Sequence, residues 1–122
     1  MSEEPRLRQE GSMSSVLAIA QSGLALQSLR LTASANNVAN AGTAGFVPDR
    51  VSAEEVASGG VKGAVQPNDP EFESRLDRTL TGLSGTDLAG ETVSQMATAA
   101  SFGADVAVAR SADEALGVLM GL

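Results

Sequence analysis

Two long stretches of the chain carry almost no charge and repeat apolar residues at helical spacing. Residues 11–48 contain one charged side chain, Arg30. One column of this stretch recurs every seven residues: Leu17, Leu24, Leu31 and Val38. The alternate column is small or polar: Met13, Ala20, Gln27, Ser34 and Ala41. This spacing predicts a helix over 14–41 with a coiled-coil-like seam, capped at its start by Ser14 or Ser15.

The same stretch is apolar on a second side. A separate line runs through Ile19, Leu26, Leu29 and Ala33. A helix that is apolar on two sides and almost uncharged is poorly suited to face water on either. Asn40 and Gly42 are expected to stop it in a left-handed conformation, and Gly42 and Gly45 to supply positive φ in the turn that follows.

The second stretch predicts a helix over 86–120, capped by Thr86 or Ser84, with Asp87 near its N-terminus. Its apolar stripe has spacings of three and four residues: Val93, Met96, Ala100, Ala104, Val108, Ala112, Leu116 and Leu119. Residues 92–104 contain no charge. We expect this stripe to form a seam with the heptad column of the first helix.

The remaining segments divide the chain into four parts. Residues 1–13 predict a disordered tail, 14–46 the N-terminal helix and turn, 47–83 a short middle segment, and 84–122 the C-terminal helix. Within the middle segment, Val61–Val65 is a candidate strand or hairpin arm, and Glu71–Leu80 could form one or two helical turns. The fold class is therefore all-α, a hairpin of two long helices with an irregular or small β segment between them.

Two helices cannot enclose each other on every side. Their outer faces are Ala, Ser, Thr, Gln and Asn instead of Lys and Glu, and such small residues allow close approach by neighbours. The sequence therefore predicts a fold that is completed by polymerisation.

Composition narrows the function classes. The chain has 122 residues and a net charge of −7, which argues against a nucleic-acid partner. It has no Cys and no His, so it lacks thiolate chemistry, the usual general base and the commonest zinc ligand. We expect no cofactor, no metal and no enzymatic activity. Polar residues inside residues 16–35 argue against membrane insertion, and acidic residues before them argue against a cleaved signal peptide.

Four groups of residues in the first helix resemble a known family. They are Ser22-Gly23-Leu24, Arg30-Leu31, Ala35-Asn36-Asn37-Val38-Ala39-Asn40 and Thr43-Ala44-Gly45-Phe46. At this spacing they are similar to the N-terminal motif of the bacterial flagellar rod and hook proteins. The segments 87–91 and 111–122 resemble the family's closing helix, with Phe102 where an aromatic residue is usual. The short middle segment is most like the proximal-rod proteins of the FlgC type. Met13-Ser14-Ser15-Val16 is similar to the family's usual start, so either Met1 or Met13 could be the first residue.

The resemblance implies a structural subunit of the basal-body rod, located in the periplasm. Such a protein assembles with itself and with other rod proteins, and is exported by the flagellar type III apparatus without a cleaved signal peptide. Its terminal helices pair in an inner coiled-coil layer and often become ordered only on assembly.

Several residues are candidates for subunit packing. We expect Asn36 and Asn37 to bond between subunits, and Asn40 to cap the first helix. Arg30 could pair with a carboxylate of a neighbouring chain or lie at the surface. Phe46 is expected to anchor the turn. The other packing candidates are Leu17, Leu24, Leu31, Val38, Val93, Met96, Phe102, Val108, Leu116 and Leu119.

Three alternatives remain open at this point. The chain could be a degenerate paralogue or type III-exported adaptor that builds no rod. It could be a homo-oligomeric helical adaptor unrelated to motility, although the Asn36–Asn40 motif argues against this. An enzyme that uses paired carboxylates is a third, and no pocket-forming sequence supports it.

Overall fold

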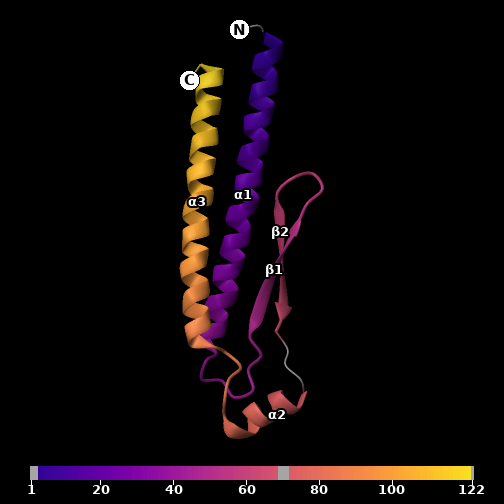
Figure 1. The fold of residues 1–122 in the computed structure, drawn as a ribbon, viewed down its shortest axis with the longest axis vertical. Helices are drawn as coiled ribbons and strands as arrows, with labels where there is room; N and C mark the ends of the chain where they lie inside the picture. The colour runs from indigo at the N-terminus through magenta and orange to yellow at the C-terminus, as the bar shows by residue number, and fades with distance from the viewer. Residues whose placement is uncertain (1–2, 69–71, 122) are drawn as a thin grey trace.

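The computed structural model describes residues 3–68 and 72–121. In chain order the elements are α1 (Glu3–Ala39), β1 (Asp49–Glu55), β2 (Val61–Pro67), α2 (Phe72–Thr81) and α3 (Leu88–Met120). Figure 1 shows α1 and α3 side by side and antiparallel, with both chain ends at the top of the view. This confirms the predicted pairing of long terminal helices with a small β segment between them in the sequence.

The first helix is longer than the sequence suggested. It begins at Glu3, so the predicted disordered tail over 1–13 is wrong for the residues from Glu3 onward, and Met1 and Ser2 lie outside the described residues. Two ion pairs at i,i+4 spacing support the added turns, Arg8 to Glu4 at 2.7 Å and Arg6 to Glu10 at 3.6 Å. Such pairs stabilise a helix, as do acidic residues in its first turn.

The helix α1 ends in a different way from the one that the sequence predicts. The helix stops at Ala39 without a left-handed residue, because neither Asn40 nor Gly42 has positive φ. The side-chain amide of Asn40 instead donates to the carbonyl of Asn36 at 2.9 Å. The side chain of Asn40 thus adds a second bond to a carbonyl that already accepts from the backbone amide of Asn40 at 3.2 Å.

Gly45 is the turn residue that does need to be glycine. Its φ is +70°, and a Cβ at this position would collide with the hydroxyl of Thr79 in α2. The amide of Gly45 donates to the carbonyl of Leu83 at 2.8 Å, and Gly85 donates to the carbonyl of Phe46 at 2.9 Å. These bonds join the loop after α1 to the loop before α3, with Phe46 half-buried between them.

The hairpin of β1 and β2 lies along α1 (Figure 1). Its strands are antiparallel, with Asp49 opposite Pro67 and Glu55 opposite Val61. It covers the second apolar line of α1, where Leu26 and Ala33 are buried. The sequence predicts that neighbouring chains cover this line, whereas in the structure the protein's own hairpin covers much of it.

The helix α3 is capped at both ends. Asp87, not Thr86 or Ser84, is the N-cap, and its Oδ1 accepts a bond from the amide of Gly90 at 3.1 Å. Gly121 closes the C-terminus in the left-handed conformation with φ of 73°. Thr86 has a different task, because its hydroxyl donates to the carbonyl of Asn37 at 2.8 Å.

The short helix α2 lies at the bottom of Figure 1. Among the described residues it approaches no other helix or strand closely, and it rests on the loops around Gly45 and Gly85. It extends over the part of Glu71–Leu80 predicted as helical turns, apart from Glu71, which is outside the described residues.

Candidate functional site

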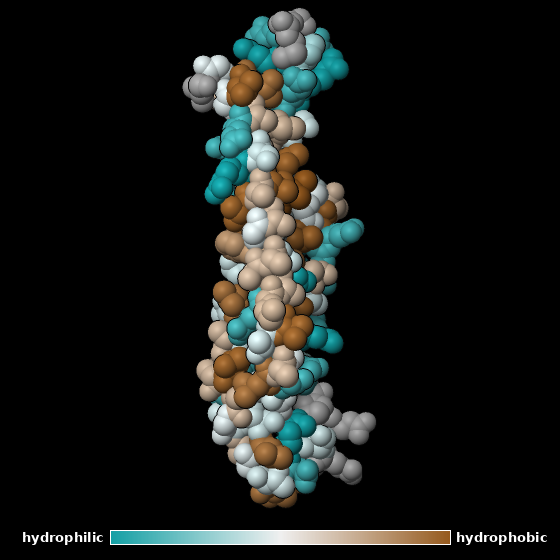
Figure 2. All heavy atoms as spheres, turned by 60° about the vertical axis from the view of Figure 1, so that its left-hand side comes forward, coloured by the Kyte–Doolittle hydropathy of each residue, from teal (hydrophilic) through white to brown (hydrophobic). Residues whose placement is uncertain are grey.

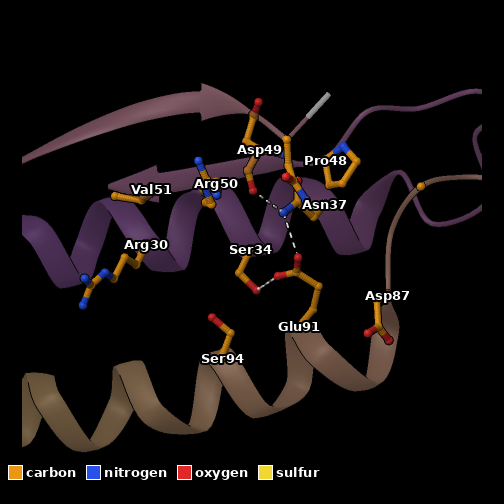
Figure 3. A pocket seen from close by; sticks show the side chains of 13 residues that line it. Arg30, Ser34, Asn37, Pro48, Asp49, Arg50, Val51, Asp87, Glu91 and Ser94 are labelled. Carbon is orange, nitrogen blue, oxygen red and sulfur yellow. Dashed lines mark hydrogen bonds between the residues drawn. The ribbon is translucent and has the colours of Figure 1, made fainter. Parts of the chain in front are cut away.

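A cluster of polar side chains joins the C-terminal end of α1, the N-terminal end of α3 and the start of β1 (Figure 3). Glu91 of α3 is its centre. One carboxylate oxygen accepts a bond from the hydroxyl of Ser34 at 2.6 Å, and the other accepts from the side-chain amide of Asn37 at 2.8 Å. Gln95 donates to the Ser34 oxygen at 3.1 Å. We call Ser34, Asn37, Asp49, Glu91 and Gln95 the polar clasp.

Asn37 extends the clasp to the hairpin. Its amide nitrogen donates to the carbonyl of Asp49 at 2.9 Å, and its oxygen accepts from the amide of Asp49 at 2.8 Å. With 1% of its surface exposed, Asn37 is fully engaged within its own chain. The inter-subunit role that we expected for its side chain is therefore replaced by an intramolecular one, because the chain itself supplies partners for a buried amide.

Asn36, one position before Asn37, lies on the exposed side of α1. Its side chain is exposed, and its oxygen accepts one long bond from Asn40 at 3.4 Å. The two adjacent asparagines thus have different environments. Asn36 is left accessible to a neighbour.

A cavity of about 280 Å³ adjoins the clasp. Arg30 and Arg50 line it together with Asp49, Asp87 and Glu91. Arg30 is half-buried, donates weakly to Gln27 at 3.4 Å, and forms no ion pair with any residue in the described ranges. This leaves its guanidinium able to meet a carboxylate of another chain, one of the two interpretations that the sequence left open.

The clasp is built to hold elements together. Both oxygens of the Glu91 carboxylate accept hydrogen bonds, one from Ser34 of α1 and one from Asn37 of α1, and Gln95 of α3 bonds to the same Ser34 hydroxyl. Within residues 3–68 and 72–121, no group of acidic side chains is arranged to hold a metal ion. The arrangement fixes the position of α3 against α1 and of β1 against both.

The seam between the long helices uses a different column of α1 from the predicted one. The residues of α1 buried there are Ala20, Gln27 and Ser34, whereas Leu31 is 51% exposed and Val38 is also exposed. Leu17 and Leu24 are half-buried at the edge. The prediction that the leucine column forms the centre of the seam is therefore wrong.

Close approach explains why the small column is inside. A Cβ at Gly23 would lie 2.7 Å from the carboxylate oxygen of Asp105 on α3. Small residues at the centre bring the two backbones together, and the larger leucines are displaced to the flank.

The predicted stripe of α3 is divided between two faces. Ala112 is buried, and Leu116 and Leu119 are half-buried in the seam. Val93 and Met96 are exposed, so their predicted place in the seam with α1 is wrong. Phe102 and Val108 are less exposed and lie at the edges of the seam, where each lines a groove together with residues of α1. In the N-terminal and middle part of α3, the residues that face α1 include Glu91, Gln95, Thr98 and Asp105, which have helical spacing and are all polar.

Two apolar surfaces are left uncovered as a result. The first is the outer face of α3, which consists of Val93, Met96, Ala100 and Ala104. Met96 is 69% exposed, and Figure 2 shows hydrophobic side chains along this side of the molecule. The second is a groove of about 280 Å³ between the helices, where Leu31 and Phe102 line an almost wholly apolar wall.

Sequence reasoning missed the role of Glu91. The sequence did contain an indication of this role. Glu91 is the last charged residue before the uncharged run of α3, and a carboxylate at this place needs a hydrogen-bond partner. The partners, Ser34 and Asn37, lie more than fifty residues earlier in the chain. Because these residues are so far apart in the sequence, local patterns could not show that they pair.

Comparison with known proteins bears out the resemblance over the first helix. Residues 17–46 match the model of a family described as "Flagella basal body rod protein". No curated protein matches the chain in a sequence search. In the described part of the chain, none of the helices is long and apolar enough to cross a membrane.

Proposed function

We propose that this chain is a structural subunit of the proximal part of the flagellar basal-body rod, and the match of residues 17–46 to the rod protein family supports this proposal. The observation that carries this proposal is the family motif on α1, which here has a definite structural use. Its Asn37 holds the clasp, its Gly45 forms the turn, and its Asn36 points outward.

The uncovered apolar surfaces support assembly as the mechanism. A water-soluble monomer rarely exposes a long uncharged helix face such as Val93–Ala104. We propose that this outer face and the Leu31–Phe102 groove pack against other copies and against other rod proteins. Arg30 would then meet a carboxylate of the neighbour.

The same proposal covers location and export. The chain would reach the periplasmic rod through the flagellar type III apparatus without loss of a signal peptide. It would act by packing, without catalysis or a cofactor. The clasp would set the angle at which the hairpin and α3 are presented to neighbours.

Deletion of the gene in its source organism, followed by electron microscopy of purified basal bodies, tests this function. We expect rods and hooks to be missing and to be restored by the wild-type chain. The double variant Val93→Glu, Met96→Glu should not restore them, because it places two charges on the outer face of α3 while leaving the buried seam intact.

The matched control is a charge of the same sign at the exposed turn of the hairpin, Ser58→Glu, which should restore rods. Normal rods and swimming in the deletion strain would contradict the proposal. That result would favour the repurposed paralogue or adaptor that the sequence also allowed.

A further inference from the structure

The cavity beside the polar clasp is lined by hydrogen-bond donors that the clasp does not use. Arg30 of α1 and Arg50 of β1 both line it. Within the described residues neither guanidinium forms an ion pair, and the side chain of Arg50 forms no hydrogen bond. Ser94 of α3 lines the same cavity, and its hydroxyl has no partner in the described part of the chain. These three side chains therefore have donors available for a ligand.

The acidic residues of the cavity are engaged to different degrees. Both carboxylate oxygens of Glu91 accept bonds within the clasp. Asp87 caps α3 through Oδ1, and its Oδ2 accepts no hydrogen bond from residues 3–68 or 72–121. Figure 3 shows Arg30 and Asp87 on opposite sides of Glu91, with Arg50 between them and next to Asp49. The cavity thus has a basic end at Arg30 and an acidic end at Asp87.

The charges that line the cavity nearly balance. Two arginines oppose Asp49, Asp87 and Glu91, and the positive end of the α3 dipole offsets about half a charge of the difference. A simple anion would be repelled by the carboxylates, and a simple cation by the guanidiniums. A zwitterion can place each of its charges beside the opposite charge. The lining therefore favours a ligand that carries both a carboxylate and an ammonium group.

The separation of the two ends indicates the length of such a ligand. Arg30 precedes Asn37 by two turns of α1, which is about 10 Å along the helix axis. Asp87 lies close to the level of Asn37, because the hydroxyl of the adjacent Thr86 donates to the Asn37 carbonyl at 2.8 Å. An extended peptide spans about 3.3–3.6 Å per residue, so about three residues cover this distance. The cavity volume of about 280 Å³ is slightly below the usual range for drug-sized ligands, which suits a molecule of this size.

We propose that this cavity binds a free peptide of about three residues by its two charged ends. The C-terminal carboxylate pairs with Arg30 and Arg50, since a planar guanidinium can hold a carboxylate through two parallel hydrogen bonds. The N-terminal ammonium pairs with Asp87, and Ser94 donates to a carbonyl of the peptide. This binding goes beyond the proposed function, because it belongs to the free subunit. In an assembled rod the carboxylate of a neighbour takes the place of the peptide at Arg30.

Titration of the ¹⁵N-labelled full chain with triglycine, followed by NMR, tests this site. The backbone amides of Arg30, Arg50 and Asp87 should shift and reach saturation with a dissociation constant on the order of 1 mM, which is usual for a ligand of this size. Two matched probes each lack one charge. N-acetyl-triglycine has no ammonium group and triglycine amide has no carboxylate, so each should bind about tenfold more weakly than triglycine.

Three variants assign the charges of the site. Arg30→Gln should weaken triglycine binding about tenfold. Asp87→Asn keeps a side-chain oxygen for the N-cap of α3 but removes the charge, so it should weaken triglycine binding about tenfold and leave the binding of N-acetyl-triglycine unchanged. Arg110→Gln is the control, because Arg110 is exposed on α3 and does not line the cavity. It should bind triglycine as the wild-type chain does, and circular dichroism should give all three variants the wild-type helix content.

Three results would overturn the proposal. The first is the absence of saturable shifts at about 10 mM triglycine. The second is an equal loss of affinity in Arg30→Gln and Arg110→Gln, which would show attraction by net charge alone. The third is equal binding of triglycine and N-acetyl-triglycine, which would show that the site recognises only a carboxylate, such as the C-terminus of another protein presents.

The basal-body experiment separates this inference from the proposed function. If the deletion strain lacks rods and the purified chain does not bind triglycine, the peptide site is wrong and the rod function stands. If the deletion strain builds normal rods and the purified chain binds triglycine, the rod function is wrong and the peptide site stands.

Discussion

Replacement of Asn37 by alanine should weaken the junction of α1, α3 and β1, because Asn37 is the clasp residue that bonds to both of the other elements. The substitution removes two bonds to the backbone of Asp49 and one to the carboxylate of Glu91. A neutral hydrogen bond contributes about 1 kcal/mol net, and one to a charged group about 1.5–3 kcal/mol, which sums to about 3.5–5 kcal/mol.

The adjoining cavity reduces this figure. Its volume of about 280 Å³ admits water, which can replace some of the lost bonds to Asp49 and Glu91. We therefore expect a loss of about 3 kcal/mol in local stability, on the order of 100-fold in the opening equilibrium. Hydrogen exchange followed by mass spectrometry measures this opening directly. Peptides that cover residues 30–40 and 86–98 should lose protection by about that factor, and residues 3–13 should not change.

Asn36→Ala is the matched control, because it removes the same side chain one position away on the exposed side of the helix. Its effect should stay within about 0.5 kcal/mol. Equal loss of protection in the two variants, or none in Asn37→Ala, would refute the view that the clasp holds the three elements together. Asn37→Asp should be at least as damaging as alanine at neutral pH, because it places a second carboxylate against Glu91.

Three further predictions concern single side chains elsewhere in the fold. Gly63→Ala should destabilise the packing of the hairpin on α1 by about 1–3 kcal/mol, because the new Cβ would lie 2.8 Å from Leu29 and 2.9 Å from Leu26, and exchange in 49–67 should report it. Gly103→Ala, where no atom lies within 4 Å of the added Cβ, should instead stabilise α3 by about 0.5–1 kcal/mol in thermal unfolding. Asp87→Ala should remove the N-cap of α3 and cost about 1 kcal/mol, measured by the same unfolding assay.

The elements with a strong local signal were predictable. The helical periods of the two uncharged stretches gave α1 and α3, and Val61–Val65 marked the second strand of the hairpin. These features depend on residues close together in the sequence. The first turns of α1 were missed, although the i,i+4 spacing of Arg8 with Glu4 and of Arg6 with Glu10 was present in the sequence.

The candidate site was only partly predictable. The sequence singled out Asn37 correctly as a residue that needs partners, but assigned those partners to another chain. A buried amide needs hydrogen-bond partners, but the residues near Asn37 in the sequence do not indicate whether these partners are Asp49, Glu91 or a residue of a neighbouring chain. Their identity depends on contacts between residues twelve and fifty-four positions apart.

What the sequence determined by itself was the set of long uncharged helices, the turn at Gly45 and the family motif along α1, because each follows from spacing and residue type within a few turns. What only the tertiary structure decided was which face of each helix is covered. The small column of Ala20 and Ser34 lies inside because two backbones approach most closely there, and the hairpin takes the second side of α1. The apolar residues Val93 and Met96 are consequently left on the outside, where another chain can reach them.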